Sequence, residues 1–113
     1  MNQPIYPVDV ETALMELSKR LENEVEVFAT ISTERAEAEA EYKRQYHSII
    51  VRMASGTVTQ KESMAQHKSA IAFREWKIVE AQEKATQQKL ISIRTQIESL
   101  RTISANVRAA SGG

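Results

Sequence analysis

The sequence predicts an all-α fold, a long antiparallel helical hairpin of the coiled-coil type. Apolar residues recur at helical spacing from Leu14 to Met53 and again from Met64 to Val107, and only a short segment around residues 54–59 interrupts them. The composition agrees, since 113 residues contain only three glycines and two prolines. Two arms of nearly equal length can fold back on each other at the interruption and bury a shared seam.

The first arm is expected over residues 9–55, after an N-terminal extension of residues 1–8 that holds both prolines. Asp9 stands where an N-cap belongs. Residues 30–33 (Thr-Ile-Ser-Thr) are a cluster of poor helix formers. They leave two alternatives, a kink or break that would give three helices, or a continuous or gently kinked helix, which we favour.

The turn is expected over residues 56–59. Gly56 can end the first helix in the left-handed conformation, and Thr59 with Glu62 matches a capping box for the next helix. The second arm then covers residues 60–109, and the Ser-Gly-Gly tail at 111–113 ends it. Residues 9–110 therefore form a single helical-hairpin domain.

The register follows from the position of the turn. If it centres near Thr57, the numbers of facing residues add up to roughly 114. Aliphatic residues then face one another near the termini, whereas Ala38 faces Trp76 and Ala72 faces Tyr42, large against small. The predicted packing residues are Leu14, Leu17, Leu21, Phe28, Ala38, Tyr42, Ile49, Ala72, Trp76, Ile93, Ile97 and Leu100.

Further apolar residues widen this seam beyond a narrow stripe, and a wider apolar face favours another partner. They are Val25, Phe28, Tyr46, Ile50, Phe73, Ile78, Val79, Ile91 and Ile103. We expect a homo-oligomer, most simply a four-helix dimer, with rings or filaments as alternatives. An ordinary scatter of exposed apolar residues remains the competing interpretation.

Charge is unevenly distributed although the formal net charge is zero. Residues 1–42 hold ten acidic and three basic residues, whereas residues 43–77, the turn end of the hairpin, hold seven basic and two acidic ones. Basic residues near aromatic ones are typical of single-strand nucleic-acid binding. The candidate nucleic-acid-binding residues are Lys43, Arg44, Arg52, Lys61, Lys68, Arg74 and Lys77. A solvated helix face, core packing of the aromatics, or charge matching between neighbouring subunits are alternatives.

No catalytic motif, metal site or cofactor site is predicted. His47 and His67 would approach each other across the turn, but neither has a carboxylate at ligand spacing. The chain has no cysteine, no signal-peptide pattern and no apolar run long enough to span a membrane. We expect a soluble, cytoplasmic, non-enzymatic protein with no membrane partner.

The Glu41-Tyr42-Lys43-Arg44 run, the short glycine-containing turn and the Ile97-Glu98-Ser99-Leu100-Arg101 segment give a family resemblance. The plan is similar to small helical-hairpin proteins that bacteriophages encode beside recombination and replication genes, some of which are recombination mediators. The resemblance implies an accessory protein in the host cytoplasm that binds single-stranded nucleic acid or a recombination enzyme through the basic tip. The alternative is a structural or adaptor coiled coil that contacts only proteins.

Overall fold

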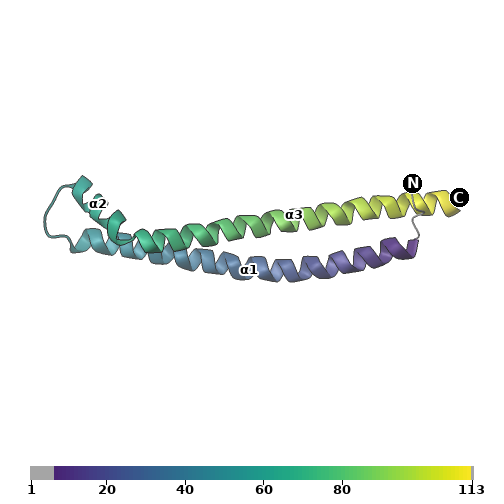
Figure 1. Ribbon diagram of the computed structural model, residues 1–113, viewed down its shortest axis with the longest axis horizontal. Helices are drawn as coiled ribbons and strands as arrows, with labels where there is room; N and C mark the ends of the chain where they lie inside the picture. The colour runs from purple at the N-terminus through teal and green to yellow at the C-terminus, as the bar shows by residue number, and fades with distance from the viewer. Residues whose placement is uncertain (1–6, 113) are drawn as a thin grey trace. The chain divides into compact units, whose positions relative to one another are not determined.

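The computed structural model describes residues 7–112, and within that range it contains helices and no strands. Helix α1 spans Pro7–Arg52, α2 spans Val58–Lys68 and α3 spans Ala70–Gly112. The chain turns back after α1, so that α3 runs antiparallel to it (Figure 1). The predicted all-α helical hairpin is therefore confirmed. Residues 1–6 of the expected N-terminal extension and Gly113 of the expected tail lie outside the described residues.

The chain divides into two compact units. Of the described residues, the terminal unit contains 7–27 and 86–112, and the turn unit contains 28–85. The boundary in α1 falls just before the poor helix formers at 30–33, but α1 continues through them without a break. The Thr33 hydroxyl donates to the carbonyl of Ala29 at 3.1 Å, so this polar side chain is satisfied within the helix.

Helix α1 begins and ends earlier than the pattern predicts. It begins at Pro7, whose fixed φ and missing N–H suit a first helical position, so Asp9 lies in the first turn and is not the N-cap. The Asp9 carboxylate still interacts favourably with the positive, N-terminal end of the helix dipole. At the other end α1 stops at Arg52, and residues 53–57 form the loop to α2.

The capping box of α2 is Thr57 with Gln60, not the predicted box at Thr59. Gly56 has φ +119°, and Thr57 follows in an extended conformation. That conformation brings the Thr57 hydroxyl to 3.1 Å from the Gln60 amide, and the Gln60 side chain accepts from the Thr57 amide at 3.0 Å. Because glutamine serves as well as glutamate in this reciprocal arrangement, the helix starts two residues earlier and Thr59 lies within its first turn.

The second arm consists of two helices, which the sequence did not predict. Ser69 separates α2 from α3 and is completely buried. Its amide donates to the carbonyl of Ala65 at 3.0 Å, and its hydroxyl donates to the same carbonyl. Serine hydroxyls that bond back to the preceding turn bend helices, and here α2 is turned out of line with α3 (Figure 1).

The core of the terminal unit is aliphatic. Leu17, Ile93 and Ile97 are buried, with Ile93 only 1% exposed. Leu14, Leu21 and Leu100 pack against these three residues. These six are the facing residues expected at this end of the hairpin. Glu24 and Lys89 form an ion pair at 2.8 Å beside them, within one residue of the predicted register.

The core of the turn unit is built from small and aromatic side chains. Ala65 and Ala72 are buried, and Phe28, Ala38 and Ile49 are half-buried. The seam here also contains contacts between large side chains, which the pattern did not predict: the Trp76 ring stacks on that of Tyr42 with centroids 5.4 Å apart.

Candidate interaction surface of the turn unit

Three of the seven candidate nucleic-acid-binding cations are already paired within the chain. Lys43 contacts Glu39 at 3.3 Å and Lys77 contacts Glu80 at 3.3 Å. Arg44 donates to Glu41 at 2.9 Å. This hydrogen bond, joined by one from Gln45, lowers the pKa of the Glu41 carboxyl to about 2. Local carboxylates therefore balance the cations at both borders of the basic stretch.

The other four candidate cations have no ion pair among residues 7–112. They are Arg52 at the end of α1, Lys61 and Lys68 on α2, and Arg74 near the start of α3. Lys61 is half-buried and the other three are exposed. The positive charge open to a partner is thus concentrated around α2.

The aromatic side chains contact one another rather than standing open as a platform. Tyr42 stacks on Trp76 and meets the edge of Phe73 with centroids 5.2 Å apart, while Tyr46 lies 5.9 Å from Tyr42. The ammonium of Lys77 lies 4.2 Å from the centroid of the Trp76 ring, a cation–π contact that covers its face. The indole N–H of Trp76 is buried and has no hydrogen-bond partner among residues 7–112. These contacts favour the packing role over base stacking.

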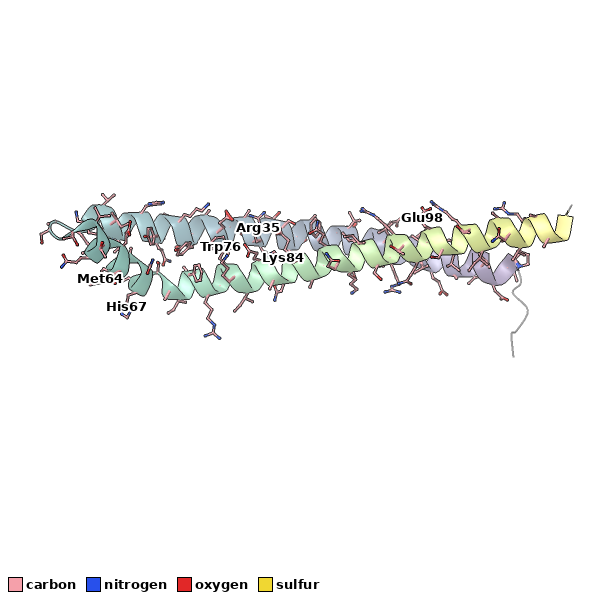
Figure 2. All side chains as sticks on the ribbon, turned by 90° about the horizontal axis from the view of Figure 1, so that it is seen from above. Arg35, Met64, His67, Trp76, Lys84 and Glu98 are labelled. Carbon is pink, nitrogen blue, oxygen red and sulfur yellow. The ribbon has the colours of Figure 1, made fainter. Side chains whose placement is uncertain are left out.

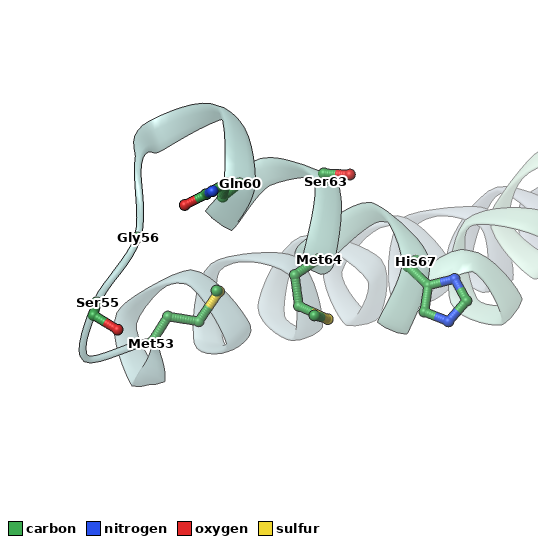
Figure 3. A pocket seen from close by; sticks show the side chains of 7 residues that line it. All are labelled: Met53, Ser55, Gly56, Gln60, Ser63, Met64 and His67. Atoms are coloured by element: carbon green, nitrogen blue, oxygen red, sulfur yellow. The ribbon is translucent and has the colours of Figure 1, made fainter.

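An open groove of about 580 Å³ lies between the loop and α2 (Figure 3). Met53 and Ser55 line it from the loop, and Gln60, Met64 and His67 line it from α2. Methionine side chains are flexible and polarisable, and they suit surfaces that adapt to a partner. Met64 and His67 project from α2 toward solvent (Figure 2).

Large apolar side chains are exposed in the same unit. Val51 is 83% exposed, Val58 is 72% exposed and Ile71 is 77% exposed. These residues stand at the end of α1, the start of α2 and the start of α3. Large apolar side chains exposed to this degree are candidates for contact with a partner. The helical pattern did not single out these three residues, although each lies beside a helix end where packing neighbours are few.

Of the nine residues expected to widen the apolar seam, four are exposed: Val25, Phe73, Ile78 and Ile91. The others are half-buried within the helix pairs. Four exposed residues spread over both units form a smaller free apolar surface than the pattern predicted. Val51, Val58 and Ile71, the most exposed apolar residues of the turn unit, are therefore the stronger candidates for a contact.

An ion pair also joins α1 and α3 within the turn unit, and the sequence did not predict it. The guanidinium of Arg35 on α1 donates to both carboxylate oxygens of Glu83 on α3, at 3.1 and 3.2 Å. Partial burial raises the pKa of the Glu83 carboxyl, but hydrogen bonds from Arg35 and Ser32 and the charges of Arg35 and Lys84 outweigh it. The pKa of Glu83 therefore lies below its usual value, and the carboxylate acts as a link between helices.

The two histidines stay separate from any carboxylate cluster. His47 meets the edge of the Tyr46 ring, His67 lines the groove, and both are exposed. In the part of the chain that the structure describes, no three His, Asp or Glu side chains group as metal ligands would. Each described helix also lacks the long apolar stretch needed to cross a membrane.

Comparisons with known proteins give no relative. No protein-family model, curated protein or solved structure matches this chain.

Proposed function

We propose that the protein is a non-enzymatic, self-associating adaptor of the coiled-coil type that acts through protein–protein contacts. The observation that carries this proposal is the exposure of Val51, Val58 and Ile71 in the unit that holds the methionine-lined groove. Burying such side chains against a partner contributes about 25 cal/mol per Å² of apolar surface. The stacked aromatic rings add support, because rings that pack against one another within the chain are not free to stack on nucleic-acid bases.

Light scattering tests this proposal directly. The wild-type protein at micromolar concentration should have a mass at least twice the 12.8 kDa of one chain. Ile71→Glu should reduce this mass, because it places a charge in an apolar contact. Ser99→Glu is the matched control, an exposed α3 position in the terminal unit. A wild-type mass near 12.8 kDa would contradict the proposal.

A second candidate function rests on the four unpaired cations. In this proposal the turn unit binds single-stranded nucleic acid, or a recombination enzyme, as the phage accessory proteins with a similar plan do. Reversing Arg52, Lys61, Lys68 and Arg74 to Glu should abolish binding to a single-stranded oligonucleotide. If all four contact phosphates, the log–log salt slope of the wild type should be about −2.8, at roughly 0.7 for each contact.

The control for this second candidate is charge reversal in the terminal unit, at Arg94 and Arg101. Arg101 pairs with Glu98 at 3.1 Å and both arginines are exposed. Equal losses from both sets would indicate diffuse attraction and not a site. A wild-type protein that binds no oligonucleotide at low salt would leave only the adaptor function.

A further inference from the structure

The charges without a partner inside the chain separate by sign. In the stretch from Arg52 to Arg74 four cations are unpaired within the described residues, against the two carboxylates Glu62 and Glu75 that lie in or next to it. The start of α1 shows the reverse. Its unpaired carboxylates in the described residues are Asp9, Glu11, Glu16, Glu22 and Glu26, against Lys19 and Arg20.

The start of α1 also has an apolar surface of its own. Val8 and Met15 are each 64% exposed, and they stand seven residues apart, which is two helical turns on the same side. Glu11 lies between them on that side, and Glu22 lies two turns beyond Met15. We call Val8, Glu11, Met15 and Glu22 the acidic face of α1. It combines two exposed apolar side chains with two unpaired carboxylates.

The groove of the turn unit has the complementary composition. Met53 and Met64 supply apolar surface inside it. The unpaired cations Arg52, Lys61 and Lys68 each stand next in sequence to a residue that lines it. Apolar surface with a rim of one charge binds best to apolar surface with a rim of the opposite charge, because each unpaired charge then gains a partner.

We propose that the groove of the turn unit binds the acidic face of α1 of a second copy of this chain. This inference rests on the proposed adaptor function and deepens it by naming the contact through which the copies associate. Met15 enters the groove against Met53 and Met64, while Glu11 and Glu22 pair with unpaired cations of the turn unit. Because the two surfaces differ, the contact is head-to-tail and each copy binds two others.

Charge reversal tests the electrostatic half of this contact. Glu11→Lys with Glu22→Lys should lower the mass of the assembly by a factor of two or more, and so should Lys61→Glu with Lys68→Glu. All four substitutions in one chain should restore the mass, because the two surfaces are again opposite in sign. Arg94→Glu is the control outside both surfaces. Circular dichroism should show unchanged helix content in every variant.

Cross-linking tests the apolar half. The natural chain contains no cysteine, so any disulfide arises from introduced residues. An affinity-tagged Met64→Cys chain mixed with an untagged Met15→Cys chain should form a mixed disulfide dimer under mild oxidation. A Ser99→Cys chain, exposed on α3 of the terminal unit, should form at least five-fold less mixed dimer.

The outcomes separate the two proposals. If the wild type is oligomeric but neither reversal lowers its mass and no preferential cross-link forms, the head-to-tail contact is wrong while the adaptor function stands. If the reversals dissociate the protein and the four-fold variant does not reassemble, the specific pairing is also wrong. A wild type that is monomeric at every salt concentration overturns both.

Discussion

Replacing Ile93 by alanine should destabilise the protein strongly, whereas replacing Ile91 should not. Ile93 is 1% exposed at the centre of the terminal core, and Ile91, two residues earlier on the same helix, is 47% exposed. The change removes three carbon groups, worth roughly 0.8 kcal/mol each when buried, and leaves a cavity that costs more. We expect Ile93→Ala to lower the free energy of unfolding by about 3 kcal/mol.

Ile91→Ala is a matched control, because both substitutions exchange the same side chains within α3. The gain in helix propensity on going from isoleucine to alanine is the same for both and cancels in the comparison. Ile91→Ala should therefore cost less than about 1 kcal/mol, in proportion to its smaller burial.

Thermal unfolding followed by circular dichroism measures the difference. At about 4 °C per kcal/mol for a chain of this size, Ile93→Ala should lower the Tm by roughly 12 °C. The protein concentration must be equal in all samples, since association of copies raises the apparent stability. If Ile91→Ala lowers the Tm as much as Ile93→Ala, the assignment of the α3 face that packs on α1 is wrong.

Three further predictions address the turn unit. Thr57→Ala should lower the free energy of unfolding in urea by about 1 kcal/mol, because it removes the cap of α2. Thr59→Ala should cost less than half as much. The reverse order would favour the capping box at Thr59. Glu83→Gln should flatten the loss of Tm on acidification. The lowered pKa of this carboxyl means that its stabilisation is complete above its ordinary pKa of 4.5 and is lost as the pH falls through the lower folded value. An unchanged pH profile would show that the link to Arg35 contributes nothing. Trp76→Phe should lower the free energy of unfolding, measured in urea, by less than about 1.5 kcal/mol. The loss is small because the substitution also removes a buried N–H that has no partner. A larger loss would mean that the N–H is hydrogen-bonded in solution.

The charge pattern shows how sequence reasoning can overstate a site. A count over residues 43–77 gives a strongly basic segment, but Lys43, Arg44 and Lys77 pair with carboxylates that lie just outside it. These partners are three or four residues away on the same helix, the spacing at which helical side chains meet. These pairs can be read from the sequence. Once each cation with a carboxylate three or four residues away on the same helix is set aside, only the four cations around α2 remain.

The sequence alone determined the two long arms, their antiparallel return and the aliphatic residues of the terminal core. These features depend on helical periodicity and on a glycine between two apolar runs, and both are local properties of the chain. The tertiary structure decided the bend at Ser69, the stacking of Tyr42 on Trp76, the Arg35–Glu83 ion pair and the groove beside α2. Each of these depends on the path by which the chain turns back. The helical pattern of each arm stays the same whichever side chains meet across the seam, so only the tertiary structure selects the partners.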